Sequence, residues 1–240
     1  MTPYAALLAR TREDPASPLL TYRQLASGER MELSSASLAN AVAKTAGLLR
    51  DELSAVPGSI VGVHLPLHWQ RAVWLGACAA TGAVFAAEAD PRDCDVCVVD
   101  RARIDLLGTA PEDVLVSLAP FGLPEPEGAP TGVVDAAVAM RSHPDTFVPY
   151  DAPEDSAPLL LQQGVAIAHG DAVDMAGSEL ARRGIAPGTR FAITEADPQA
   201  DLLCLAGPLA GRSSVVLVAD PQSGDLAGVL REEGATLAAG

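Results

Sequence analysis

Apolar and polar positions alternate along the chain with two periods, one typical of helices and one typical of strands. Leu38, Val42 and Leu49 keep to one face at helical spacing. Ser34 precedes them as a good N-cap, so a helix is predicted over about 35–53. Short apolar runs between Gly and Pro predict buried strands, and their alternation with helices indicates an α/β fold with parallel strands. The other strands are expected at 19–24, 30–33, 60–65, 84–89, 96–99, 114–118, 158–161, 191–194 and 215–218, and the other helices at 3–12, 70–80, 133–141, 171–183 and 199–210.

The second part of the chain repeats the pattern of the first. A shift of 130 residues places Pro57-Gly58 on Pro187-Gly188 and Asp90-Pro91 on Asp220-Pro221. The order of helix, Pro-Gly, strand, helix, strand and Asp-Pro is the same in both parts. We therefore expect two similar parallel-sheet α/β subdomains that pack through helices.

These two subdomains are expected to form one domain over 1–240, with the first layer at about 1–150 and the second at about 155–240. The segment 143–158 between them holds four prolines and several acidic residues, which is typical of a linker or a surface excursion. His143 lies at the start of this segment, directly before a proline, and is expected at the surface.

Composition and charge narrow the class of protein. Hydrophobic residues make up 49% of the 240 residues, which is enough to bury a sizeable core. The net charge is -15 and the 16 basic residues form no stripe, so binding to nucleic acid or to an anionic membrane is not expected. No apolar run reaches membrane-spanning length and Met1–Arg12 lacks the features of a signal peptide, which predicts a cytoplasmic protein.

Neither metal nor redox chemistry is expected from the cysteines and histidines. Cys94 and Cys97 form a lone C-x-x-C in a predicted buried strand, where residues three apart point to opposite faces. His64 and His68 have the spacing of helical metal ligands, but Pro66 and the strand before it rule out a shared helix. The sequence therefore predicts no metal and no cofactor.

Three segments carry motifs that pack strands against helices. Val56–Pro66 reads V-P-G-S-I-V-G-V-H-L-P, Trp74–Phe85 reads W-L-G-A-C-A-A-T-G-A-V-F, and Gly207–Leu217 reads G-P-L-A-G-R-S-S-V-V-L. Together they resemble the large N-terminal domain of the adenylate-forming superfamily, the AMP-binding enzymes that include acyl-CoA synthetases and adenylation domains. The resemblance covers essentially the whole chain as scaffold. The Ala- and Arg-rich, Lys-poor composition is also similar to that of short actinobacterial proteins of this kind.

The same resemblance implies that the parts that bind ATP are missing. The family holds the triphosphate with a loop, S-G-T-T-G-x-P-K-G, after a strand that here would be Pro158–Leu161. The chain instead passes from Gln163 directly to Gly164-Val165-Ala166-Ile167-Ala168-His169, which resembles the family's stretch after the loop. It also ends at Gly240, before the later ATP motifs and the catalytic lysine, and its only lysine, Lys44, is expected in solvent at the edge of a helix. Because each such element contributes several kcal/mol to the transition state, adenylation is expected to be negligible.

The residues beside the missing loop are the remaining site candidates. Gln163, Gly164, His169 and Asp171 are expected to contact a ligand, and no residue is assigned as catalytic. One interpretation makes His169 a base that Asp171 orients. The other, which we favour because no nucleophile in a recognisable setting accompanies them, has Asp171 cap the next helix while His169 only packs or hydrogen-bonds nearby.

The leading hypothesis is a catalytically incomplete homologue of adenylate-forming enzymes that acts as a binding or interaction module. Apolar surface left by the missing segments would be covered by self-association into a homo-oligomer or by a protein partner. One alternative is an enzyme of altered chemistry that uses His169 and Asp171 in a cleft between the layers. Another is a residual AMP or acyl binder without turnover.

Overall fold

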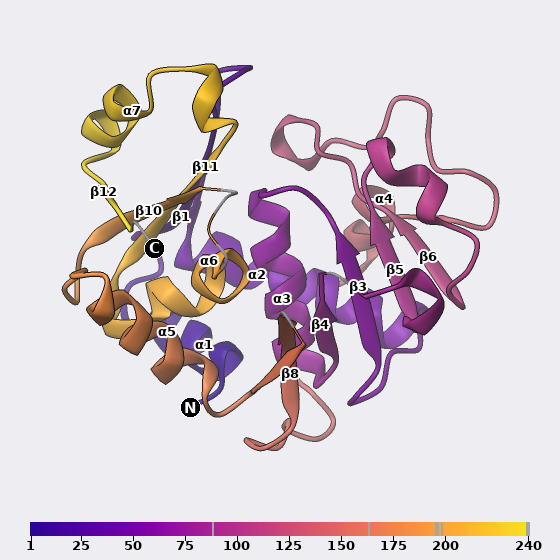
Figure 1. Ribbon diagram of the computed structural model, residues 1–240. Coiled ribbons are helices and arrows are strands. Elements are labelled where there is room, and N and C mark those ends of the chain that lie inside the picture. Colours follow the sequence, from indigo (N-terminus) through magenta and orange to yellow (C-terminus); the bar gives the residue numbers. More distant parts are fainter. Residues whose placement is uncertain (88, 163, 195–196, 198, 239–240) are drawn as a thin grey trace. The chain divides into compact units, whose positions relative to one another are not determined.

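The computed structural model describes residues 1–87, 89–162, 164–194, 197 and 199–238, and it has the predicted α/β architecture (Figure 1). Nowhere in these ranges does a helix have both the length and the apolar character needed to cross a bilayer. The helices are α1 (Pro3–Glu13), α2 (Ser35–Gly47), α3 (Trp69–Thr81), α4 (Ala136–Ala139), α5 (Ala172–Arg182), α6 (Ala200–Leu209) and α7 (Leu226–Glu233). The strands are β1 (Pro18–Gln24), β2 (Glu29–Ser34), β3 (Ile60–His64), β4 (Val84–Ala86), β5 (Val96–Val99), β6 (Glu112–Leu115), β7 (Val134–Asp135), β8 (Pro158–Gln162), β9 (Val165–Ala168), β10 (Arg190–Thr194), β11 (Ser214–Ala219) and β12 (Thr236–Leu237).

A five-stranded sheet in the order β12-β10-β11-β1-β2 organises one compact unit. Its strands are parallel except for β2, which forms an antiparallel hairpin with β1. Helix α6 packs on β10 and β11, and α1 and α5 pack on α6. The other face of the sheet is covered by α7, because Val216 and Val218 of β11 pack against Leu226 and Leu230.

A seven-stranded sheet in the order β7-β6-β5-β3-β4-β8-β9 organises the second compact unit. All of its strands are parallel except β9, which is antiparallel to β8. All four residues of β5 are buried, which explains its continuous apolar sequence, since parallel strands are covered on both faces. On one face Cys97, Val99 and Leu115 pack against partly buried side chains, which are Leu106, Leu107, Ala110, Ala129 and Val133.

Strand register confirms the internal repeat. Ile60 of β3 pairs with Val84 of β4, and Arg190 of β10 pairs with Ser214 of β11. Each pair joins residues 24 apart in sequence (84 − 60 and 214 − 190), and the pairs are related by the same 130-residue shift (190 − 60). The strand–helix–strand segments β3-α3-β4 and β10-α6-β11 are therefore equivalent in topology and in register.

The Pro-Gly landmarks make the same contacts in both repeats. The Gly58 N–H donates to the Gly82 carbonyl at 2.8 Å, and the Gly188 N–H donates to the Gly211 carbonyl at 2.8 Å. Gly82 and Gly211 have φ of +82° and +70°. A Cβ at Gly82 would lie 3.2 Å from the Cβ of the proline before Gly58, and one at Gly211 would lie 2.9 Å from that of the proline before Gly188. Both positions therefore require glycine for conformation and for space.

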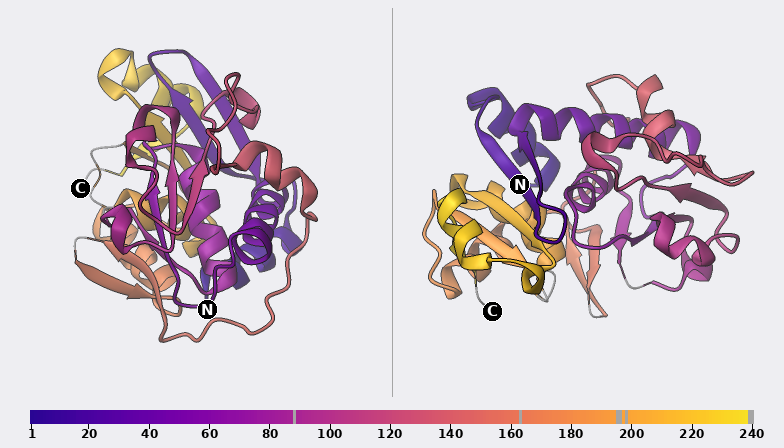
Figure 2. Two further views of the ribbon diagram at one scale, coloured as in Figure 1. Left: turned by 90° about the vertical axis from the view of Figure 1, so that its right-hand side faces the viewer. Right: turned by 90° about the horizontal axis from the view of Figure 1, so that it is seen from above.

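The division into units and the helix over 133–141 differ from the sequence prediction, and strands β7 and β9 were not among those expected. The compact units are 1–39, 66–72 and 170–240 on one side and 40–65 and 73–169 on the other, so the chain does not divide near residue 150. The reason is that β1 pairs with β11, which places the first 39 residues in the same sheet as the C-terminal segment. The helix predicted over 133–141 is shorter. It consists of α4 and a 3₁₀ turn, after which 143–157 runs extended to β8 (Figure 2).

Candidate functional site

A tight hairpin lies where the resemblance implies a phosphate-binding loop. Strands β8 and β9 pair antiparallel with Gln162 opposite Val165, so only positions 163 and 164 separate them. Gly164 is exposed and has φ of +76°, the left-handed conformation that suits glycine in a hairpin turn. Gln163, the other candidate ligand residue of this turn, lies outside the described residues. The structure therefore connects β8 to β9 by the shortest common type of turn.

His169 follows β9 and is buried. Its backbone N–H donates to the Ala157 carbonyl at 2.9 Å, which continues the hairpin ladder. Its side chain is 0% exposed, and no described residue hydrogen-bonds to Nδ1 or Nε2 of the ring. Burial lowers the pKa of the His169 imidazole, an effect that the carboxylate of Asp155 partly opposes. Burial therefore favours the neutral form of the ring.

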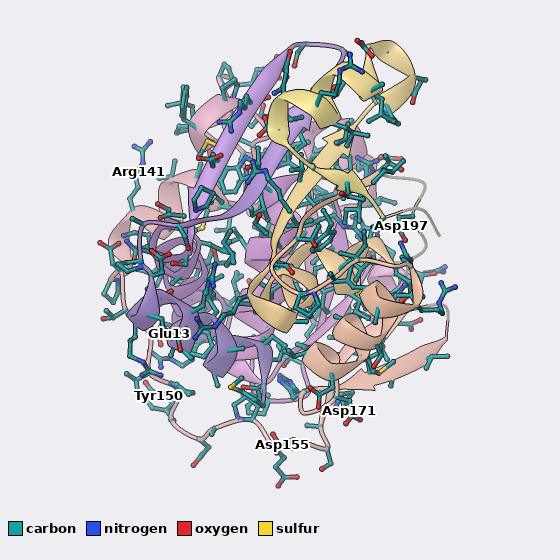
Figure 3. The ribbon with its side chains drawn as sticks, turned by 90° about the vertical axis from the view of Figure 1, so that its left-hand side faces the viewer. Glu13, Arg141, Tyr150, Asp155, Asp171 and Asp197 are labelled. Atoms are coloured by element: carbon teal, nitrogen blue, oxygen red, sulfur yellow. The ribbon has the colours of Figure 1, made fainter. Side chains whose placement is uncertain are left out.

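Asp171 is exposed and precedes α5 at the N-cap position (Figure 3). Its carbonyl accepts the Met175 N–H at 2.8 Å, but its side chain makes no capping hydrogen bond. Neither sequence interpretation therefore describes this residue in full. Asp171 occupies the N-cap position, but its carboxylate does not cap the helix. No hydrogen bond joins Asp171 to the ring nitrogens of His169.

The other histidine and cysteine candidates of the sequence analysis do not form a metal or redox site in the described residues. His64 ends β3 and His68 precedes α3, so the two do not share a helix. Burial lowers the pKa of His68 to about 3. Burial also raises the pKa of Cys94 to about 11 and that of Cys97 to about 12. The described part of the chain contains no group of three potential metal ligands.

The prediction that His143 lies at the surface is wrong. The ring is 8% exposed and its Nε2 lies 2.8 Å from Oε1 of Glu52. It packs against Gly47 at the end of α2, where a Cβ would lie 2.7 Å from Nδ1 of the ring. Lys44 of the same helix is only partly exposed, because its ammonium donates to the His143 carbonyl at 2.8 Å and pairs with Asp145 at 2.7 Å.

A second group of contacts ties the extended segment 143–157 to the end of α2. Helix α2 continues as a π-helix, η1 (Leu48–Glu52), which carries Arg50. The Cζ of Arg50 lies 4.5 Å from the ring centroid of Phe147 and 4.3 Å from that of Tyr150. Its guanidinium donates to the Val148 carbonyl at 3.0 Å and to both carboxylate oxygens of Asp51, at 2.7 and 3.1 Å.

Sequence reasoning missed this cluster because it interpreted 143–158 as a linker or a surface excursion. One signal was present. Aromatic residues make up only 4% of the chain, and two of them lie three positions apart at Phe147 and Tyr150, in a segment otherwise rich in proline and acids. Aromatic side chains that are rare elsewhere in a chain are poor candidates for a solvated linker, since they contribute large contact areas.

Comparison with known proteins places these features in context. No protein-family model matches the sequence. A protein of Mycobacterium tuberculosis (strain ATCC 25618 / H37Rv) described as a TIGR03089 family protein is 39% identical over 217 residues, which cover 88% of this chain and 86% of that protein.

Solved structures of acyl-CoA synthetases share the fold. The acyl-CoA synthetase of Brucella canis superposes with a TM-score of 0.79 at 17% identity, covering 99% of this chain and 47% of that enzyme. The acetoacetyl-CoA synthetase of Streptomyces lividans superposes with a TM-score of 0.73 at 21% identity, covering 92% of this chain and 39% of that enzyme. The chain thus spans less than half the length of either enzyme.

Proposed function

The chain belongs to the TIGR03089 protein family, and from that premise we propose that it is a catalytically incomplete relative of acyl-adenylate-forming enzymes that acts as a binding or interaction module. Its likeness to solved acyl-CoA synthetases at 17% and 21% identity carries the fold and not their activity. The observation that carries the proposal is the turn between β8 and β9.

Adenylation joins a carboxylate to the α-phosphate of ATP, and it needs donors that hold the triphosphate and the charge that develops in the transition state. The family resemblance implies that a glycine- and hydroxyl-rich loop supplies them after the strand that corresponds to β8. In this chain Gln162 pairs directly with Val165, so the hairpin leaves two positions for that loop. Such a turn is too short to wrap a triphosphate, which supports the proposed loss of adenylation.

The geometry does not favour an enzyme of altered chemistry at His169. A general base must lie within hydrogen-bonding distance of the proton that it removes and must be accessible to substrate. The His169 ring is 0% exposed, and no described residue orients it through a hydrogen bond. A packing role in the hairpin explains the same observations without a reaction.

An interaction role is supported by β9, which forms an edge of the seven-stranded sheet. Val165 of this strand is 61% exposed, and Ala166 beside it is exposed as well. Edge strands present backbone N–H and C=O groups that can pair with another strand, and apolar side chains on such an edge favour that pairing. This edge is the place where we propose that a second copy or a protein partner binds.

Pyrophosphate exchange tests the loss of adenylation. The protein is incubated with Mg²⁺, ATP, labelled pyrophosphate and a panel of carboxylic acids, with an active acyl-CoA synthetase as the positive control. We expect no exchange above background and no thermal shift with ATP, although a ligand at 100 times its Kd would add about 2.7 kcal/mol to stability. Exchange that increases in proportion to the protein concentration would overturn the proposal.

Light scattering after size exclusion tests the interaction role of the β9 edge. We expect association that weakens at low concentration and that the substitution Val165→Lys abolishes, because a charge on the edge opposes pairing. Val138→Lys is the matched control, since Val138 is 53% exposed and lies on α4. A monomer at every concentration would exclude self-pairing through β9.

A further inference from the structure

We propose that a pocket in the unit of residues 40–65 and 73–169 binds an uncharged, flat apolar molecule, such as one built on an aromatic ring system. The pocket has a volume of about 370 Å³, which is within the range of small-molecule sites in proteins. Its location, its lining and the charges around it lead to this class of ligand. The inference deepens the binding role proposed above and rests on it.

The pocket lies at the amino ends of β3 and β4, two central strands of the seven-stranded sheet. Pro57, just before β3, and Thr81, at the end of α3 just before β4, both line it. Strands β4 and β8 are parallel, and the β8–β9 turn follows the carboxyl end of β8. Parallel strands have their amino ends on one side of the sheet and their carboxyl ends on the other. The pocket therefore lies at the amino ends of the strands and the turn at the carboxyl ends. The pocket is therefore distinct from the position of the missing loop.

Apolar groups form most of the pocket wall. Residues 55–57 supply one side, and Phe147, Pro149 and Tyr150 of the extended segment supply another. Val56 is 61% exposed and Tyr150 is 83% exposed, and the Tyr150 ring projects from its segment (Figure 3). Apolar and aromatic side chains that stay exposed beside a hollow are typical of ligand sites.

The charges around the pocket favour an uncharged ligand. Arg50 lines the pocket, but its guanidinium is already paired with both carboxylate oxygens of Asp51. Asp151 also lines the pocket, so an anionic ligand would meet more negative than positive charge. A neutral aromatic ring can instead pack against the exposed Tyr150 ring, since the Arg50 guanidinium already lies against Phe147 and Tyr150.

The backbone around the pocket departs from regular geometry. The π-helix η1 carries Arg50, and Ser54 after it has φ of +54°, in the left-handed region. Both features are less stable than regular helix and turn geometry, and such features are frequent at functional sites. Lys44 and Glu52 hold the start of the extended segment against the same helix. The wall that carries Tyr150 is thereby preformed.

Two fluorescent probes with one ring system test this inference. N-phenyl-1-naphthylamine is uncharged, and 1-anilinonaphthalene-8-sulfonate adds a sulfonate to the same rings. We expect saturable binding of the neutral probe at one site per chain, and at least about tenfold weaker binding of the sulfonate. Val56→Trp fills the pocket from an exposed position and should weaken the neutral probe at least about tenfold. Tyr150→Ala should weaken it several-fold.

Val138→Trp is the matched control, because Val138 is similarly exposed but does not line the pocket. It should bind the neutral probe as the parent protein does, and circular dichroism should show that all variants fold. The inference is overturned if the neutral probe shows no saturable binding, if Val56→Trp binds it as tightly as Val138→Trp, or if the sulfonate binds equally well.

The two proposals fail separately. Observed pyrophosphate exchange would refute the loss of adenylation. It would not affect the interpretation of the probe data, since the pocket and the β8–β9 turn lie at opposite ends of the strands. A negative probe experiment would remove this ligand site and leave the consequence of the short β8–β9 turn unchanged.

Discussion

Glu233, the last residue of α7, accepts hydrogen bonds from three arginines. Its carboxylate lies 2.7 Å from Arg23, 2.8 Å from Arg30 and 2.8 Å from Arg190, and its side chain is 5% exposed. Burial alone would raise the pKa of Glu233, but the hydrogen bonds from these arginines outweigh burial and lower the pKa from 4.5 to about 2. The cluster joins α7 to both strands of the β1–β2 hairpin and to β10, so its loss should be measurable as global stability.

The magnitude follows from this shift in pKa. A difference between 4.5 and about 2 corresponds to at most about 3–4 kcal/mol, because each pKa unit is worth about 1.4 kcal/mol. Arg30 is 44% exposed, so solvent screening reduces the expected value to about 1–2 kcal/mol. Since the folded-state pKa is the lower one, this stability is fully present above pH 4.5 and is lost as the pH falls from about 4.5 toward about 2.

Urea unfolding of the parent protein and of Glu233→Gln, followed by circular dichroism between pH 7 and pH 3.5, tests this reasoning. We expect Glu233→Gln to lose about 2 kcal/mol at pH 7, because it leaves three guanidinium groups without their shared acceptor. The difference between the two proteins should shrink as the pH falls below 4.5. Glu232→Gln is the matched control, since Glu232 is adjacent, 66% exposed and bonded only to Arg23 among the described residues. It should change stability by less than about 0.5 kcal/mol. A difference for Glu233→Gln that is independent of pH would refute the assigned role of its carboxylate.

Two further predictions concern the repeat and the extended segment. Gly211→Ala should lower the free energy of unfolding by about 2–3 kcal/mol, whereas Gly188→Ala should cost only about 1 kcal/mol, because both have positive φ but only Gly211 lacks space for a Cβ. Equal losses of unfolding free energy for the two variants would show that the proline beside Gly211 moves to accommodate the Cβ without a loss of stability. Lys44→Met should speed amide hydrogen exchange in 143–151, because it removes the bonds to the His143 carbonyl and to Asp145. Unchanged exchange would show that packing alone holds the segment.

Most of the helices and strands and the repeat between the two parts were predictable from the sequence, although β7 and β9 were not among the expected strands. Apolar periodicity fixes the type of each element, and the Pro-Gly and Asp-Pro pairs mark equivalent turns. The composition of the two compact units was not predictable. β1 pairs with β11, which lies almost two hundred residues away in the sequence. The local pattern of apolar residues in a strand does not predict which strand it pairs with.

The candidate site was predictable only in part. The shortness of the connection after Gln162 is visible in the sequence, but the pairing that makes it a hairpin is not. His143 was expected in solvent because it lies beside a proline in a polar segment. Its burial depends on the space that Gly47 leaves on α2, a tertiary contact between residues far apart in sequence. The cluster around Arg50 was missed for the same reason.

The burial of the four cysteines has a practical consequence. Cys78, Cys94, Cys97 and Cys204 are all free thiols in the interior, and burial raises the pKa of each. Thiolate, and not thiol, reacts with maleimides, so the native cysteines should label slowly in the folded protein. A single cysteine placed on the surface, for example beside the pocket or on β9, can then carry a spectroscopic label without removal of the native four. Distance and dynamics measurements on this chain thus need no cysteine-free background.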